Sequence, residues 1–188
     1  MPIVEGMGEV EETNVMIGVK VNAGGVEHFG GFSTNLLISS EVGLTQGREI
    51  HGQPKKMGST KIKTVNNEIV AEVFRGNALI SRVVMPVSKQ AAQVSELEKY
   101  FPFRENINHK VIRNIDGTQG INQITSRILG DVVVKECWRG PSKLTIEFNE
   151  SAPFHLLPVL ETIESFYWKA DFALVPGSIL HDYLKAGA

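Results

Sequence analysis

The sequence is poor in cysteine, with a single residue, Cys137, among 188. One thiol excludes an internal disulfide framework. The first residues also lack the charged and then apolar pattern of a secretory signal peptide. Because both marks of export are missing, we expect the protein to reside in the cytoplasm.

Long apolar runs and an excess of one charge are lacking as well. No apolar stretch approaches the roughly 18 residues that a membrane-spanning helix needs, although 42% of the residues are hydrophobic. The net charge of -2 and the sequence pI near 6.2 indicate no basic surface for nucleic acid. The composition therefore predicts a soluble globular protein that binds neither a membrane nor nucleic acid.

Patterns typical of several enzyme classes are missing too. The five histidines are scattered, without the paired spacing of a zinc site, and no serine lies in a nucleophile elbow. The glycine pairs Gly24-Gly25 and Gly30-Gly31 fit neither a dinucleotide-binding nor a P-loop pattern, so we interpret them as turns. We therefore expect no metal and no cofactor.

The chain does contain many short stretches of β-type alternation. Residues 15–21 alternate apolar and polar side chains, and residues 32–38 are more uniformly apolar. Further strands, separated by hairpin-type breaks, are predicted over residues 61–65, 68–74, 77–85, 108–115, 121–129, 131–138, 143–148 and 165–175. Sequential hairpins predict a mainly β fold with an antiparallel barrel or sandwich. The length predicts one domain over residues 1–188.

Helical signals are fewer. Ser88 resembles an N-cap for an amphipathic helix over residues 89–100, which Pro102 would end and which would pack on the sheet. Two shorter helical segments are predicted at residues 158–164 and 178–184.

Two adjacent lysines, Lys55 and Lys56, follow a proline between turn-forming glycines. A lysine becomes a nucleophile only when its amine is neutral near pH 7, which requires desolvation or a nearby positive charge. Successive side chains of an extended strand point to opposite faces. We therefore expect the two lysines to diverge, with burial favouring the neutral amine of Lys55.

The segment that contains these lysines resembles the signature of the acetoacetate decarboxylase family. Gly47-Arg48-Glu49 is followed by Pro54-Lys55-Lys56 and then by Gly58. Three more motifs follow in the family's order and approximate spacing: Asp116-Gly117, Glu136-Cys137-Trp138-Arg139-Gly140-Pro141 and Asp182-Tyr183-Leu184-Lys185. The resemblance thus extends over nearly the whole chain.

The resemblance implies both a fold and a function. The fold is a barrel-like or cone-like antiparallel sheet whose interior holds the active lysine. Acetoacetate decarboxylase is the standard example of a lysine activated beside another cation. By resemblance, Lys55 forms a Schiff base with a β-keto acid and Lys56 is its cationic neighbour. We therefore expect a carbon–carbon lyase that decarboxylates acetoacetate or a related β-keto acid.

Other site residues are implied as well. Glu12, which follows Gly6-Met7-Gly8, matches a glutamate that reaches the active lysine, although Glu9 and Glu11 are close enough in sequence to compete for this role. The remaining candidates are Arg48, Gln53 and Leu36 as substrate-binding residues. Arg48 and Glu49 match the family's Gly-Arg-Glu, and we also expect them to form a structural ion pair or a loop anchor beneath the lysines.

Two departures from the family keep alternatives open. A family-length N-terminal segment with a functional arginine is not matched, and Arg48 or Arg113 are the candidates to replace that arginine. Gln53 places a polar amide beside the lysine pair. A Schiff-base aldolase or dehydratase acting on a larger keto acid therefore stays open, as does a non-catalytic small-molecule-binding homologue.

The unmatched segment also leads to an expectation about assembly. Strands of that segment would otherwise cover sheet edges and apolar faces, and an exposed edge is prone to pairing. We therefore expect a homo-oligomer that buries residues around 15–38 between subunits, with a pocket around Lys55 more open than in a full-length decarboxylase.

Overall fold

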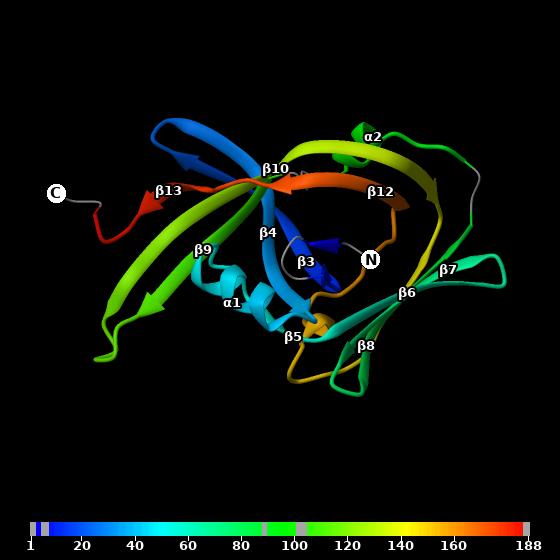
Figure 1. Cartoon of the computed structure of the whole chain (residues 1–188), viewed down its shortest axis with the longest axis horizontal. Helices are drawn as coiled ribbons and strands as arrows, with labels where there is room; N and C mark the ends of the chain where they lie inside the picture. Colours follow the sequence, from blue (N-terminus) through cyan, green and yellow to red (C-terminus); the bar gives the residue numbers. More distant parts are fainter. Residues whose placement is uncertain (1–2, 5–7, 88–89, 101–104, 186–188) are drawn as a thin grey trace.

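The computed structural model describes residues 3–4, 8–87, 90–100 and 105–185, and most of these lie in strands (Figure 1). The helices are α1 (Glu41–Glu49), α2 (Val94–Glu98) and the 3-10 helix η1 (Phe154–Leu156). The strands are β1 (Ile3–Val4), β2 (Gly8–Glu9), β3 (Glu12–Ala23), β4 (Val26–Ile38), β5 (Lys55–Met57), β6 (Ser59–Val65), β7 (Glu68–Arg75), β8 (Ala78–Pro86), β9 (Glu105–Arg113), β10 (Gln119–Gly140), β11 (Lys143–Ile146), β12 (Ser165–Leu174) and β13 (Ser178–Asp182).

The strands form two main sheets that curl into a half-barrel. The larger sheet has the order β12-β10-β9-β4-β3, with β13 paired to β10 and β5 paired to β4. The smaller sheet has the order β11-β8-β7-β6. Figure 1 shows β10 and β12 arching over β4, with the smaller sheet at one end. The predicted mainly β, antiparallel barrel-like class is confirmed, although β4 pairs with β5 and β9 in parallel.

The first hairpin differs in part from the prediction. Gly24 and Gly25 form the expected turn, with φ of 60° and 83°. Gly30 and Gly31 do not form a turn, because they lie inside β4. A Cβ at Gly30 would lie 2.6 Å from the carbonyl oxygen of Glu105. This glycine is therefore required where β4 approaches β9, and not for a change of direction.

Strand β10 joins two segments that the sequence analysis separated. Gly130 and Asp131 were expected to end one strand and begin the next, but both lie within β10. The pairing with β12 shifts register between Gly130 and Val133, and Asp131 has a φ of 50°. The glycine therefore marks a β-bulge, which bends a strand without ending it.

The predicted helices are mostly wrong in their bounds. Helix α2 begins at Val94, after Gln93, because residues 90–92 bond to β10 instead: Ala92 N donates to Cys137 O at 3.0 Å. Ser88 and Pro102, its predicted limits, lie outside the described residues. Residues 158–164 are not helical, and β13 replaces the last predicted helix, since it pairs with β10.

Strand β4 separates two buried apolar clusters because its side chains alternate between faces. Leu37 packs with Val73, Ile80, Ala152 and Phe154, between the two sheets. Leu36 and Ile38 pack with Val10 on the other face, with Leu44 of α1 against them. Lys55 is the register partner of Leu36, so the second face also carries the lysine.

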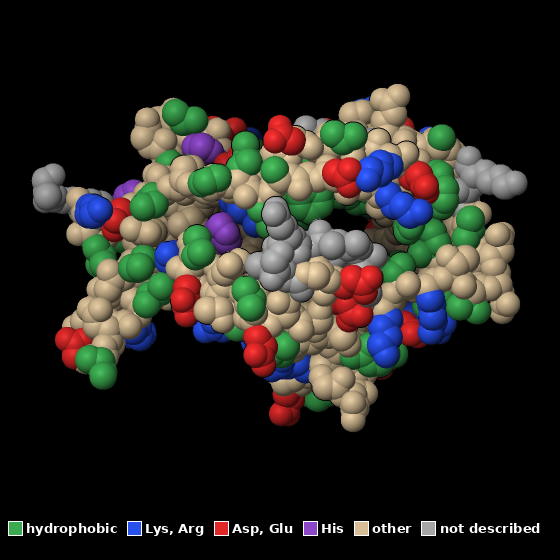
Figure 2. Space-filling model, viewed as in Figure 1, with side chains coloured by type: hydrophobic (Ala, Val, Ile, Leu, Met, Phe, Trp, Pro, Cys, Tyr) green, Lys and Arg blue, Asp and Glu red, His purple; other side chains and the backbone are tan. Residues whose placement is uncertain are grey.

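The surface is mixed in charge. On the face shown in Figure 2, acidic and basic side chains are interspersed with hydrophobic ones around a central hollow. None of the helices in the described part of the chain is long and apolar enough to cross a membrane.

Candidate active site

Helix α1 sets the position of the lysine segment, and the sequence analysis missed it. Ser40 caps the helix by accepting a hydrogen bond from Gly43 N at 3.1 Å. A Cβ at Gly43 would lie 2.7 Å from Ile38 Cδ1, and one at Gly47 would lie 2.5 Å from Lys55 Cε. The two glycines, one turn apart, therefore let α1 lie directly against β4 and β5.

The loop of residues 50–54 connects α1 to Lys55 and is tied back to the helix. Gln53 N donates to Gly47 O at 2.9 Å, and Gly52 N donates to Arg48 O at 3.2 Å. Arg48 Nη1 donates to Lys55 O at 3.3 Å. The exposed side chain of Arg48 thus has the anchoring contact that was expected. Its predicted role in binding substrate stays a prediction.

The two lysines diverge as the strand geometry predicts. Lys55 is buried, and its side chain is 10% exposed. Its Nζ donates to Glu12 Oε2 at 2.8 Å. Lys56 is exposed, and its Nζ donates to Ser151 O at 3.1 Å. The two amines therefore lie on opposite faces of β5.

Glu12 is the acidic candidate that reaches Lys55. It lies at the start of β3, opposite Ile38 of β4, and its side chain is 35% exposed. Glu11 points elsewhere, since its Oε2 accepts from Thr60 N at 2.9 Å, and Glu9 is exposed on β2. Of the three acidic candidates, the structure brings only Glu12 into hydrogen-bonding contact with Lys55.

A buried amide network lies beside the lysine. Gln53, which is 3% exposed, donates from Nε2 to Asn106 Oδ1 at 2.9 Å. Asn106 Nδ2 donates to Gly31 O at 2.9 Å and to Ser33 Oγ at 3.0 Å. Asn108 Nδ2 donates to Asn106 Oδ1 at 2.8 Å. These bonds fix the 50–54 loop against β9 and β4.

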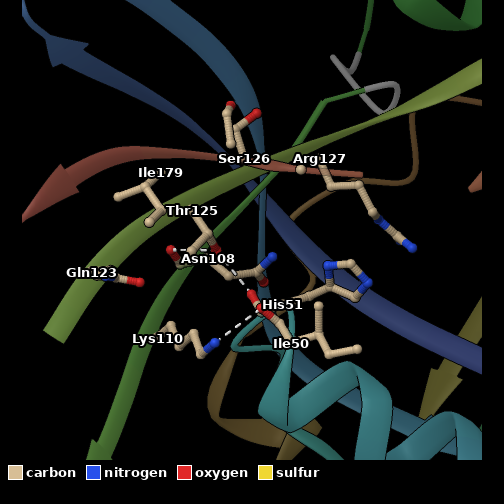
Figure 3. A pocket seen from close by; sticks show the side chains of 11 residues that line it. Ile50, His51, Asn108, Lys110, Gln123, Thr125, Ser126, Arg127 and Ile179 are labelled. Carbon is tan, nitrogen blue, oxygen red and sulfur yellow. Dashed lines mark hydrogen bonds between the residues drawn. The ribbon is translucent and has the colours of Figure 1, made fainter. Parts of the chain in front are cut away.

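A cavity of about 180 Å³ opens beside this network (Figure 3). Asn108 and Lys110 of β9 line it, together with Thr125 and Arg127 of β10 and with His51. Thr125 Oγ1 donates to His51 O at 2.9 Å, and Lys110 Nζ donates to Ile50 O at 3.2 Å. The cavity wall therefore combines polar and cationic side chains of β9, β10 and the 50–54 loop with the apolar side chains of Ile50 and of Ile179 in β13. Lys55 itself does not line this cavity.

Burial and neighbouring charges shift the pKa values of two side chains in this region. Burial, and then the charges of Arg127, Lys55 and Lys110, lower the pKa of His51 to about 4. Burial also lowers the pKa of Arg127, and the negative charge of Glu12 opposes this shift. His51 is therefore neutral at pH 7. The described residues contain no group of three or more histidine, cysteine or acidic side chains arranged to hold a metal ion.

Sequence reasoning missed the roles of His51, Asn106 and Arg127 in this region. His51 was considered only as one of five scattered histidines, although it lies within the lysine segment. Gln123, Thr125 and Arg127 lie at every second position of β10 and so share one face. This run of polar side chains is visible in the sequence. Assigning that face to the cavity, however, requires the pairing of β10 with β9. Arg113, a candidate to bind a carboxylate, instead donates to Gly117 O at 3.0 Å in an exposed turn.

Comparison with known proteins identifies the family. The sequence profile of the acetoacetate decarboxylase family matches residues 2–184. The chain belongs to the acetoacetate decarboxylase family. It is 30% identical over 185 residues to acetoacetate decarboxylase 3 of Mesorhizobium japonicum, and this match covers 98% of the chain and 70% of the relative.

Solved structures of the family agree with the fold. A structure of an acetoacetate decarboxylase superposes with a TM-score of 0.87 at 30% identity, over 96% of this chain and 72% of the other. The acetoacetate decarboxylase of Legionella pneumophila superposes with a TM-score of 0.86 at 25% identity, over 95% and 70% of the two chains. The resemblance of the lysine segment to this family is thereby confirmed.

Proposed function

We propose that the protein is a lysine Schiff-base lyase that decarboxylates acetoacetate or a related β-keto acid. The observation that carries this proposal is the buried Lys55, whose Nζ lies 2.8 Å from Glu12 Oε2. A buried amine beside one carboxylate has a proton acceptor at hand and little water to compete with substrate. Membership of the family supports the same chemistry.

The reaction proceeds through an imine on Lys55. Glu12 accepts a proton from the ammonium, and the neutral amine attacks the ketone carbon of the substrate. Glu12 returns its proton to the hydroxyl that leaves as water, and a protonated imine forms. When the bond to the carboxylate carbon breaks, its electron pair moves into the imine and carbon dioxide departs. Glu12 takes up a proton from solvent and passes it to the enamine carbon, and hydrolysis releases the ketone and restores Lys55.

The neighbouring residues have supporting roles in this proposal. Leu36, 1% exposed and in register with Lys55, supplies an apolar wall that favours loss of the charged carboxylate. Gln53 fixes the approach to the lysine through Asn106 and is a candidate to bind substrate. Lys56 acts at longer range, because its amine lies on the opposite face of β5. Arg48 holds the backbone of Lys55.

The test is borohydride reduction in the presence of acetoacetate, followed by mass mapping of the adduct. We expect the adduct on Lys55. Lys55→Arg should abolish it, because a guanidinium does not form an imine at neutral pH. Lys56→Arg, the matched variant on the opposite face, should keep substantial trapping and activity. An adduct on another residue, or none in the folded protein, contradicts the proposal. Release of carbon dioxide distinguishes a decarboxylase from an aldolase or dehydratase.

We also propose that the protein is a cytoplasmic homo-oligomer whose residues 1–188 form one acetoacetate decarboxylase-like domain. The β3–β4 hairpin supports an oligomer, because Ile17, Val26 and Phe29 are 44%, 58% and 52% exposed. β3 is also an end strand of the larger sheet. Light scattering should give a multiple of the 20.7 kDa chain mass. Phe29→Ser should reduce the mass, and a wild-type monomer at working concentrations contradicts the assembly.

A further inference from the structure

Arg127 lies on the face of the larger sheet that carries the active-site network. It pairs in register with Asn106 of β9, so the two side chains lie on one face of the sheet. Asn106 in turn binds Gln53, two residues before Lys55. Figure 3 shows the Arg127 side chain extending from β10 toward the region of His51. The charges of Arg127 and Lys55 both act on His51, and Glu12, which bonds Lys55, also acts on Arg127, so the guanidinium and the lysine lie in one region.

Arg127 also differs from the other arginines in its partners. Among the six arginines that the structure describes, five have a hydrogen bond or an ion pair: Arg48, Arg75, Arg82, Arg113 and Arg139. For Arg127 neither is found among the described residues, and its Nε is buried without a hydrogen-bond partner. A buried, unpaired donor on a charged group is costly unless a ligand satisfies it.

The surrounding charges favour an anion as that ligand. Arg127, Lys110 and Lys55 contribute three positive charges near His51, and Glu12 is the acidic group that acts on Arg127. Glu12 is already bound to Lys55. A carboxylate is the natural partner for the guanidinium, because it accepts two parallel hydrogen bonds in the plane of the arginine.

The chemistry of decarboxylation restricts which carboxylate this is. The leaving carboxylate loses its charge as carbon dioxide forms. A guanidinium bound to it would stabilise the substrate more than the transition state, and would slow the reaction. A carboxylate that keeps its charge throughout the reaction has no such disadvantage. Arg127 is therefore suited to a second carboxylate of the substrate.

We propose that Arg127 binds a non-reacting carboxylate, and that the preferred substrate is a β-keto acid with two carboxylates. One carboxylate lies at Arg127 and is retained. The other leaves as carbon dioxide while the ketone is held as an imine on Lys55. This inference rests on the proposed function. Arg127 lines the cavity of about 180 Å³, which has room for the retained carboxylate end of a small acid.

The test compares two keto acids that differ by one carboxylate, acetoacetate and 3-oxoglutarate. The wild type should favour 3-oxoglutarate by about tenfold or more in kcat/KM. Arg127→Met should lower kcat/KM for 3-oxoglutarate by roughly 10- to 100-fold, mainly through KM, the range for loss of one or two charge-assisted hydrogen bonds. The kcat/KM of Arg127→Met for acetoacetate should change by less than about threefold, and Arg127→Lys should restore part of the loss for 3-oxoglutarate.

Arg113→Met, which removes an exposed arginine from the β9–β10 turn, is the matched control.

Several outcomes overturn the proposal. Equal losses for both keto acids in Arg127→Met mean that Arg127 holds the reacting carboxylate or only supports the fold, and urea unfolding separates these two cases. A wild type that does not favour 3-oxoglutarate also overturns it.

A second measurement keeps the result distinct from failure of the proposed function. Calorimetric binding of glutarate, which has no ketone, does not depend on imine formation. We expect Arg127→Met to weaken glutarate binding at least about tenfold, while Arg113→Met does not. If borohydride traps no imine in the wild type but glutarate binds as expected, the proposed lyase activity is wrong and the proposed carboxylate site at Arg127 stands. If glutarate binds wild type and Arg127→Met equally, the carboxylate site is wrong.

Discussion

The two faces of β4 differ sharply in what they bury. One face, with Leu36 and Ile38, adjoins α1, Lys55 and the amide network. The other face, with Leu37, adjoins the smaller sheet and an apolar cavity of about 570 Å³ lined by Val15, Val73 and Leu144, among others. Alternation along one strand thus places a polar site and an apolar core on opposite faces of one layer.

The comparison indicates how the fold stays stable although the polar face reduces stability. Buried polar groups contribute little net stability, and unpaired ones reduce it. Asn14 Oδ1, Gln53 Oε1 and Asn108 Oδ1 are buried without partners among the described residues. Apolar burial on the opposite face offsets this cost. Substitutions on the polar face should therefore change chemistry, and those on the apolar face should change stability.

The largest effects are expected from a matched pair of substitutions, Leu36→Ala and Leu37→Ala. These adjacent side chains are 1% and 2% exposed and point to opposite faces of β4. Each variant should lose about 2–5 kcal/mol of unfolding free energy, because each leaves a cavity. Only Leu36→Ala should also slow imine formation per folded molecule. Urea unfolding and borohydride trapping measure the two effects.

Leu36→Val and Leu37→Val are the milder pair if either alanine variant does not fold. Equal slowing of imine formation in both members of a pair would show that the two faces are not functionally separate.

The next largest effect is expected from Gly47→Ala. The new Cβ would lie 2.5 Å from Lys55 Cε and 3.0 Å from Gln53 Oε1, so the lysine side chain must move. A displacement of about 1 Å at a reacting group costs on the order of 100-fold in rate, which corresponds to about 2.7 kcal/mol. Single-turnover trapping with borohydride measures this loss. Thr45→Ala, at an exposed position of α1, is the control. Unchanged trapping in Gly47→Ala would mean that the amine tolerates movement.

The sequence predicted the catalytic candidates of the polar face better than the helix that positions them. Period-2 alternation correctly separated Lys55 from Lys56, since it depends only on local backbone geometry. The family resemblance pointed to Glu12. Helix α1 was missed because Gly43 and Gly47 lower intrinsic helix propensity. The reason for both glycines is tertiary, namely contact with Ile38 and Lys55, and no local pattern reveals it.

Long-range pairing accounts for the other errors. Gly130 and Asp131 have the composition of a turn, but pairing with β12 accommodates them as a bulge. Arg127 was not selected because its face is defined by its register with Asn106 on another strand. Residues 178–184 have no strong alternation, and β13 exists because β10 offers it an edge.

The smallest expected effect concerns pH and again separates the two faces. The folded protein holds the pKa of His51 at about 4, whereas the unfolded chain has the ordinary value near 6.5. Between these values the unfolded chain binds a proton that the folded protein does not, so unfolding free energy falls as pH drops from about 6.5 toward 4. Because His51 is only half-buried, solvent screening reduces the effect to about 1 kcal/mol.

Urea unfolding at about pH 7 and pH 5 should show the wild type losing more stability than His51→Gln, while the exposed His109→Gln behaves like the wild type. An identical loss in His51→Gln would mean that burial and the cations of the polar face do not lower the pKa of His51. The two faces would then not differ in their electrostatics.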